Sequence, residues 1–235
     1  MKTYSRLTLA FLLLILVVPQ VGADEPPENR EAVVFWADSS SVTYHEPGKV
    51  RSVQPYKDGK KHGTYIEWHE NGKKEREGHW KNGERDGLRT VWHKNGQKWR
   101  EDHYKNGKLD GLLTDWYENG QKKVESQYKN GKLDGLWTVW YENGQKRSEA
   151  HYKDGKLDGL GTKWHENGQK REEGYYKNFK RDGLNTWWYK NGQKESERHY
   201  KNGKYDGLRI HWDEDGNKTL EIQHVNDKEI SRKEF

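Results

Sequence analysis

Residues 128–151 read YKNGKLDGLWTVWYENGQKRSEAH, and close copies of this 24-residue phrase follow one another seven times between residues 56 and 223. One position of the phrase is always Trp and another is always Glu. These positions are Trp68, Trp92, Trp116, Trp140, Trp164, Trp188 and Trp212, with Glu77, Glu101, Glu125, Glu149, Glu173, Glu197 and Glu221. A strict period of this length predicts a repeat array, in which each unit becomes stable by stacking on its neighbours.

Two turn signals divide each repeat, as at Asn130-Gly131 and Asn143-Gly144. Asn-Gly pairs tolerate the positive φ angles of a type I′ turn, whose twist suits a β-hairpin. The residues between the turns are rich in strand-forming Trp, Tyr, Thr and Val. The sequence therefore predicts an all-β protein, an elongated single-layer antiparallel sheet built as a meander of β-hairpins. Asn178-Phe179 lacks the Gly of its counterparts, so we expect that loop to be distorted or specialised.

Alternation with a period of two gives the sheet two different faces. Leu136, Thr138 and Trp140 share one face, and the other repeats carry the same or similar residues there. Trp137 and Val139 lie on the opposite face, where the repeats differ. We expect the first face to hold the fold, with cation–π contacts between Trp and Arg or Lys, and the second face to carry specificity.

Two-residue loops would fix the strand register. The pairs expected in the repeat that starts at residue 128 are Thr138 with Glu149, Trp140 with Arg147, Gly135 with Tyr152, and His151 with Asp158.

The composition is polar, with 30% hydrophobic and 34% charged residues and a mean hydropathy of −1.40. Such values are typical of disordered chains, but 12 Trp and 14 Tyr at fixed intervals argue against disorder. The chain contains no Cys, which excludes disulfides and thiolate chemistry.

The segment 1–23 resembles a secretory signal peptide, with Lys2 and Arg6 before an apolar run at 7–18 and small residues before a cleavage site after Ala23. We therefore expect a secreted, periplasmic or cell-envelope protein without a transmembrane anchor in the mature chain. The expected divisions are a signal peptide (1–23), a flexible leader (24–31), an N-terminal degenerate half-repeat (32–55), seven repeats (56–223) and a C-terminal degenerate half-repeat (224–235).

The pattern Tyr-Lys-Asn-Gly-Lys-x-x-Gly-x-x-x-x-Trp-Tyr-x-Asn-Gly resembles the MORN repeat variant of many bacterial proteins. The resemblance extends over all seven copies. It implies an elongated antiparallel sheet that serves as an interaction scaffold. Some proteins of this family carry the label of a toxin–antitoxin antitoxin component, which makes an antitoxin-like role an alternative.

A row of His and Asp residues is the sharpest candidate for chemistry. His79, His103, His151 and His199 occupy one repeat position, and Asp86, Asp110, Asp158 and Asp206 are their expected cross-strand partners. Such groups could bind metal or act as general bases. Their recurrence favours structural hydrogen bonding instead, because catalysis needs one differentiated site.

Familiar enzyme motifs are absent from the sequence, including His-Glu-x-x-His and Gly-x-Ser-x-Gly. We expect a protein that is not an enzyme and needs no cofactor. The Lys residues that recur near the turns are matched by acidic residues, which favours solvated sheet edges over nucleic-acid binding.

We expect a protein partner, with a cell-wall glycan as the alternative. Aromatic rings can stack on sugars or hold quaternary ammonium groups. The candidate ligand-binding residues are Trp99, Trp137, Trp187, Tyr189 and Phe179. Packing of Trp137 and Trp187 on the neighbouring repeat is the competing interpretation.

Overall fold

A computed structural model describes residues 39–235 of the chain, and every regular element in this range is a β-strand. The expected signal peptide, the leader and the first residues of the N-terminal half-repeat lie outside the described residues. The strands are β1 (Ser39–Glu46), β2 (Lys49–Lys57), β3 (Lys60–Lys61), β4 (Gly63–Trp68), β5 (Lys74–Lys81), β6 (Glu84–Arg85), β7 (Gly87–Trp92), β8 (Lys98–Lys105), β9 (Lys108–Trp116), β10 (Lys122–Lys129), β11 (Lys132–Trp140), β12 (Lys146–Lys153), β13 (Lys156–Trp164), β14 (Lys170–Lys177), β15 (Lys180–Trp188), β16 (Lys194–Lys201), β17 (Lys204–Trp212), β18 (Lys218–Val225) and β19 (Lys228–Glu234).

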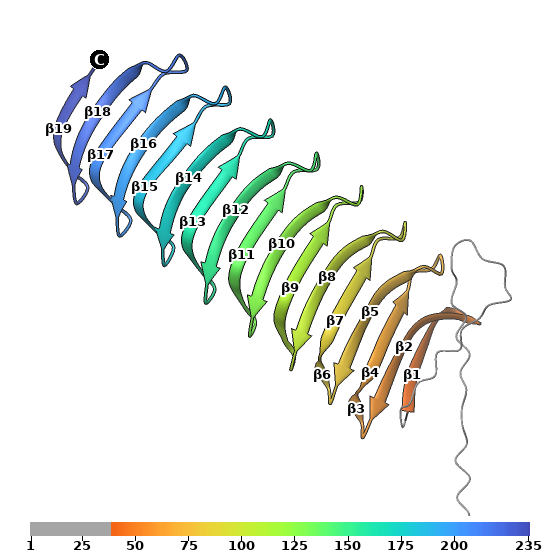
Figure 1. Cartoon of the computed structure of the whole chain (residues 1–235). Helices are drawn as coiled ribbons and strands as arrows, with labels where there is room; N and C mark the ends of the chain where they lie inside the picture. Colours follow the sequence, from red (N-terminus) through yellow and green to blue (C-terminus); the bar gives the residue numbers. More distant parts are fainter. Residues whose placement is uncertain (1–38) are drawn as a thin grey trace, which may run out of the picture.

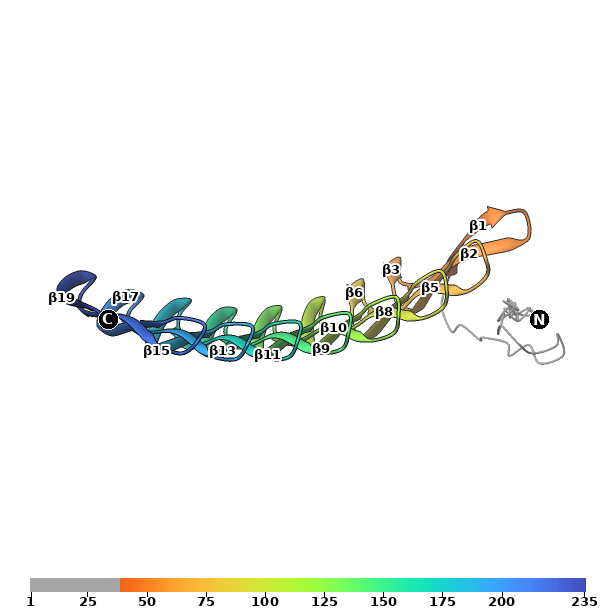
Figure 2. The same ribbon diagram turned by 90° about the horizontal axis from the view of Figure 1, so that it is seen from above.

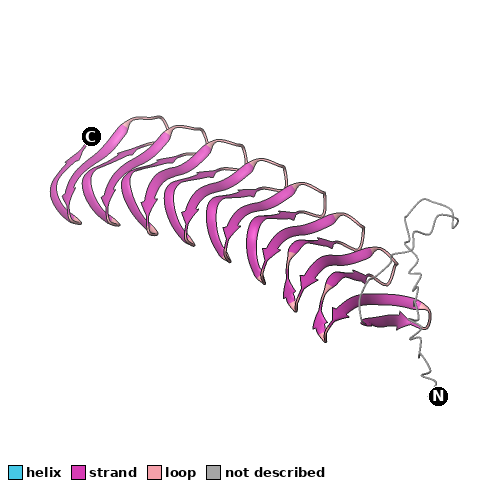
Figure 3. Ribbon diagram, turned by 60° about the horizontal axis from the view of Figure 1, so that its bottom comes forward, coloured by secondary structure: helices cyan, strands magenta, loops and turns pink. Residues whose placement is uncertain are grey.

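All strands belong to one antiparallel sheet in which neighbours in the chain are neighbours in space (Figure 1). The strands are bowed in the same sense, so the layer forms a long curved ribbon (Figures 2 and 3). This open hairpin meander confirms the predicted fold class. No helix in the described part of the chain is long and apolar enough to cross a membrane.

The short turns have the predicted type I′ geometry. Asn130 has a φ of 50° and Gly131 a φ of 81°, and Lys129 pairs directly with Lys132 across the turn. Both central residues must adopt positive φ in this turn, which Asn tolerates and Gly adopts at little cost.

The longer turns differ from the prediction of a two-residue loop. Tyr141 N–H donates to Gln145 at 2.9 Å, and Gly144 N–H donates to Tyr141 at 3.0 Å. Only Gly144 of the Asn143-Gly144 pair has a positive φ, at 83°. This is a three-residue loop in which a left-handed Gly follows a four-residue turn. The prediction was wrong because Asn-Gly suits either loop.

The loop and its bulge determine which register pairs are correct. Thr138 pairs with Glu149 and Gly135 with Tyr152, as predicted. Trp140 pairs with Lys146 and not with Arg147, because the register shifts after Val139. A second shift falls between Ala150 and Tyr152, so His151 has no paired residue in the β12–β13 ladder.

Gly135 shows why each repeat needs a central Gly. Its φ is 128°, and a Cβ there would lie 2.9 Å from Cβ of Gln127 on the preceding strand. No side chain fits such a close approach of two strands.

Apolar burial is concentrated at the N-terminal end, where Val53, Ile66 and Trp68 form a core cluster. Farther along, small polar residues such as Thr138, 3% exposed, occupy the middle of the sheet. A single layer offers too little depth for a thick apolar core, so stability depends on contacts repeated from strand to strand.

Candidate functional site

The first surface, called here the repeat face, comprises Leu136, Thr138, Trp140, Glu149 and the equivalent residues of the other repeats. A Lys that begins each returning strand, such as Lys122, lies over the Trp of the following repeat. The distances from Nζ to the ring centroid are 5.6–5.9 Å for the pairs Lys74–Trp92, Lys98–Trp116, Lys122–Trp140, Lys146–Trp164, Lys170–Trp188 and Lys194–Trp212. The predicted cation–π column is therefore present, and Lys supplies its cations.

The invariant Glu of each repeat holds this Lys in place. Lys146 Nζ donates to Glu149 at 2.5 Å, and Thr138 donates to the same carboxylate at 3.5 Å. An equivalent Lys–Glu ion pair forms in each of the other repeats. The Trp and Glu positions expected to be structural thus belong to one continuous Trp–Lys–Glu network.

A second ladder joins the loops of successive repeats. The hydroxyl of Tyr141 donates to the backbone carbonyl of Trp164 at 2.9 Å, and His165 bonds the carbonyl of Trp188 at 3.1 Å. Tyr189 belongs to this ladder, since its hydroxyl donates to Trp212 at 2.9 Å. Tyr189 therefore makes a structural contact and is also a candidate ligand-binding residue.

The His and Asp row makes separate contacts with the backbone. Asp110 accepts the amide of Asn130 in the neighbouring turn at 3.1 Å, and equivalent bonds involve Asp86, Asp158 and Asp182. His103 and His199 donate through Nδ1 to the carbonyls of Leu112 and Leu208. The side chains do not form the expected His–Asp pairs, although the backbone N–H of Asp86 donates to the carbonyl of His79 at 3.0 Å across the strands. The carboxylates of Asp86, Asp110 and Asp158 accept bonds from the next turn instead. No cluster of three or more metal-ligating side chains occurs within residues 39–235.

The second surface, called here the variable face, comprises Trp137, Val139, Ser148, Ala150, Tyr152 and their equivalents. The residues of this face differ between repeats, and residues on neighbouring strands form complementary pairs. Arg89 forms a two-bond ion pair with Asp102, at 2.8 and 2.5 Å, and Asp102 is 1% exposed. Arg100 pairs in the same way with Asp115, and the bonds to this carboxylate raise the pKa of Arg100.

Glu172 is the centre of the largest charged group on the variable face. Lys163 donates to its carboxylate at 2.8 Å and Arg181 at 2.6 Å, while the hydroxyl of Tyr176 lies 3.2 Å away. Burial acts to raise the pKa of Glu172, but the bonds from Lys163 and Arg181 outweigh it and the pKa falls.

Two predicted ligand-binding tryptophans make internal contacts on this face. Trp187 lies beneath two guanidinium groups, with Arg198 at 4.4 Å and Arg181 at 5.1 Å from its ring centroid. Trp137 packs edge-on against Tyr152, with ring centroids 6.2 Å apart. Both rings are half-buried. These contacts agree with the competing interpretation of packing, since both tryptophans contact the neighbouring strand.

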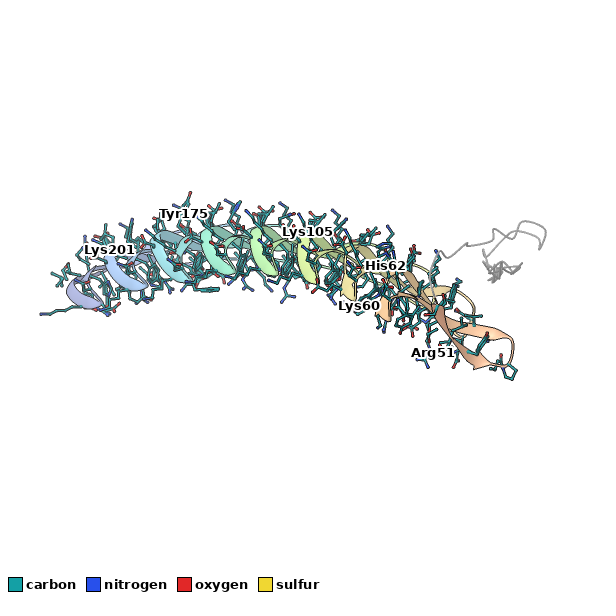
Figure 4. The ribbon with its side chains drawn as sticks, turned by 90° about the horizontal axis from the view of Figure 1, so that it is seen from below. Arg51, Lys60, His62, Lys105, Tyr175 and Lys201 are labelled. Atoms are coloured by element: carbon teal, nitrogen blue, oxygen red, sulfur yellow. The ribbon has the colours of Figure 1, made fainter. Side chains whose placement is uncertain are left out.

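Trp99 and Phe179 are the predicted residues with the most open surface. Trp99 is 43% exposed and lies beside His93 and Arg100. Phe179 is 58% exposed at the tip of a turn. Tyr175, on the same strand pair, is 56% exposed and points away from the sheet (Figure 4).

The Asn178-Phe179 turn keeps the geometry of its counterparts. Asn178 has a φ of 49° and Phe179 a φ of 65°, and Phe179 N–H donates to Leu157 at 2.9 Å. The expected distortion of the loop is therefore wrong. The neighbouring strands impose the turn, and Phe179 adopts a left-handed conformation that is unfavourable for a bulky residue.

A pocket on the variable face was not predicted from the sequence. It has a volume of about 170 Å³ and lies near the N-terminal end of the array, among residues of β2 to β8. Lys61, Trp80, Arg85 and Tyr104 line it, and Gly78 forms part of its wall. The available signal was Gly78, which stands where later repeats carry Ser126 or Ala150.

Comparison with known families agrees with this architecture. The model of the MORN repeat variant matches residues 61–82, 85–106, 109–130, 133–154, 157–178 and 181–202, which together exceed half of the chain. It matches six repeats where the sequence analysis counted seven, and the unmatched copy is the one that contains Trp212. No curated protein matches the chain significantly.

Proposed function

Because the chain belongs to the MORN repeat variant family, we propose that it is an exported, non-enzymatic scaffold that binds a protein partner in the cell envelope or outside the cell. Repeats of this family commonly form scaffolds for interaction with proteins or membranes. A partner bound along such an array would touch several repeats at once, each with its own side chains.

The observation that carries the proposal is the contrast between the two faces. The position of Thr138 is Thr in five consecutive repeats, and these residues are buried on the repeat face. The neighbouring position is Arg89, Leu113, Trp137, Gly161, Asn185 and Arg209 in successive repeats. Leu113 and Asn185 are buried, whereas the other four residues are half-buried. A constant framework that presents changing, half-buried side chains suits recognition of one particular partner.

Export rests on the signal-like segment 1–23. The array has no covalent cross-link to maintain, so its ladders of ion pairs and hydrogen bonds would serve equally outside the cytoplasm. The proposed partner is therefore a protein of the envelope or the surroundings of the cell.

Two capture experiments test this function. Purified protein is incubated with envelope extract and, separately, with cell-wall sacculi. Specific enrichment of one protein without sedimentation on sacculi would support the scaffold. Sedimentation that soluble glycan or choline competes away would instead establish the cell-wall alternative, and Trp99→Ala should then weaken it because Trp99 is the most exposed of the predicted tryptophans.

Capture of a toxin from cytoplasmic extract, with no envelope partner, would favour the antitoxin-like alternative. Fractionation of cells that express the tagged chain tests export independently of any partner. Recovery of unprocessed protein in the cytoplasm alone would contradict the proposed location.

A further inference from the structure

The pocket at the N-terminal end of the variable face carries positive charge without an internal counter-ion. Lys61 Nζ lies 4.6 Å and the Arg85 guanidinium 5.5 Å from the ring centroid of Trp80. Arg85 also lies 5.3 Å from the ring centroid of Tyr104. Within residues 39–235 neither Lys61 nor Arg85 forms an ion pair, although both are half-buried. Two partly desolvated cations on one aromatic ring are costly unless an anion joins them.

The other two cations of the pocket are already paired. Arg89 is held by the buried carboxylate of Asp102. Arg76 lies 3.2 Å from Glu75 and 3.6 Å from Glu67. The excess charge is therefore confined to Lys61 and Arg85, on either side of Trp80 in the chain.

The protein contains a filled counterpart of this pocket four repeats along the array. Arg181 occupies the repeat position of Arg85, and it donates to Glu172 at 2.6 Å. The repeat position of Glu172 is occupied in the pocket by Arg76, a cation. The pocket thus has the guanidinium of the Glu172 site and lacks its carboxylate.

The Gly residues of the two sites have different neighbours. At Gly174 an added Cβ would lie 1.3 Å from the amide nitrogen of Asn185, so a side chain fills the space. At Gly78 the nearest atoms are Cγ and Cβ of Arg89, at 3.3 and 3.6 Å, so the stem of Arg89 packs on this Gly. The pocket of about 170 Å³ lies beside Arg89, among Lys61, Trp80 and Arg85.

We propose that the pocket receives an acidic side chain of the protein partner, whose carboxylate binds between Lys61 and Arg85 and gives Arg85 the counter-ion that Glu172 gives Arg181. This inference rests on the proposed function and adds the chemistry of the contact. The volume is below the roughly 300–1,000 Å³ of pockets for small-molecule ligands, which favours a single side chain over a metabolite. The guanidinium of Arg85 lies over the rings of Trp80 and Tyr104 and donates one bond to the Tyr104 hydroxyl at 3.3 Å. Its remaining N–H groups can donate to a carboxylate.

Binding of a fluorescently labelled hexaglutamate peptide to the purified protein tests the inference, with hexaglutamine as the uncharged probe. We expect hexaglutamate to bind, hexaglutamine not to bind, and Lys61→Gln with Arg85→Gln to weaken the affinity at least tenfold. The matched control is Lys132→Gln with Lys156→Gln, which removes the same charge from exposed turn residues. This control should leave the affinity within twofold of the unmodified protein.

A second variant closes the pocket and leaves the net charge of the protein unchanged. Glu67→Lys with Arg76→Glu copies the arrangement of Lys163, Glu172 and Arg181. We expect this variant to keep a cooperative thermal transition and to lose hexaglutamate binding, since the built-in carboxylate occupies Arg85. A folded variant with lost binding cannot be explained by unfolding.

Absence of hexaglutamate binding, or equal loss in the pocket variant and the turn control, would overturn the inference. Retained binding by the Glu67→Lys, Arg76→Glu variant would also overturn it. None of these results tests the proposed scaffold function, because capture of the envelope partner is measured separately. A partner still captured by the pocket variant would leave the proposed function standing and place the contact elsewhere.

Discussion

The ammonium group of Lys122 lies 5.8 Å from the ring centroid of Trp140, a residue of the following repeat. The same ammonium pairs with Glu125 of its own strand. Each Lys thereby joins its repeat to the next, and the contact recurs along the array. Coupling between neighbouring repeats is what makes a one-layer sheet cooperative.

Loss of the Trp at this contact should cost far more than loss of the charge. We expect Trp140→Ala to lower the free energy of unfolding by about 3 kcal/mol, since it removes a large ring from contact with two strands. Lys122→Met keeps the aliphatic stem and should cost only about 0.5–1 kcal/mol, the value of a partly exposed cation–π contact. Urea unfolding monitored by circular dichroism measures both. Equal losses would show that the charge, and not the ring, couples the repeats.

Relief of the left-handed conformation at Phe179 should stabilise the protein. Phe179→Gly is expected to raise the free energy of unfolding by roughly 1 kcal/mol, because left-handed backbone costs a residue with a Cβ about 1–2 kcal/mol and Gly does not incur this cost. The measurement is the midpoint of urea unfolding. Gly155→Phe, at the equivalent turn, is the matched control and should destabilise by a similar amount. A loss of stability in Phe179→Gly would reveal favourable packing of the Phe ring.

The fold was predictable because the long repeat period and the strand alternation both appear in the sequence. The Asn-Gly and Asp-Gly pairs located most of the turns, and alternation assigned Trp140 and Trp137 to opposite faces. The loop at Asn143 was mispredicted because Asn-Gly is compatible with two loop types. The bulge beside His151 falls at Gly159, one of the recurring central Gly residues, whose φ is 125°. Such a Gly indicates a bulge but does not give the register across it.

The site was less predictable than the fold. Exposure of an aromatic residue depends on its cross-strand neighbours, and Trp187 is covered by Arg181 and Arg198 while Trp99 is open. Two differences separate the pocket from the Glu172 site: Arg89 stands in place of Asn185, and Arg76 in place of Glu172. Both are recognised only when equivalent repeats are compared in three dimensions.

Glu172 should stabilise the protein in a pH-dependent way. Its pKa in the folded chain lies below the ordinary value of 4.5, so its contribution is complete above that pH and is lost as the pH falls through the folded pKa. We expect Glu172→Gln to cost about 2 kcal/mol at pH 7, the scale of hydrogen bonds to a charged group. The difference between the two proteins should shrink below pH 4.5, as urea unfolding at several pH values will show. A difference that is constant down to pH 3 would mean that shape rather than charge matters here.

His211 should destabilise the folded chain as it takes up a proton. Burial and the nearby charges of Arg209 and Arg198 lower its pKa to about 4, against an ordinary 6.5. Between these values the unfolded chain binds the proton more tightly, so stability must fall as the pH drops from 6.5 toward 4. Titration of the imidazole resonances by NMR should place His211 near pH 4, and His211→Gln should make the free energy of unfolding less dependent on pH in this window. His165, whose ring bonds the backbone carbonyl of Trp188 in the ladder that joins the loops, provides the control substitution. A pKa of His211 near 6.5 would show that Arg209 and Arg198 lie farther from the ring than their contacts indicate.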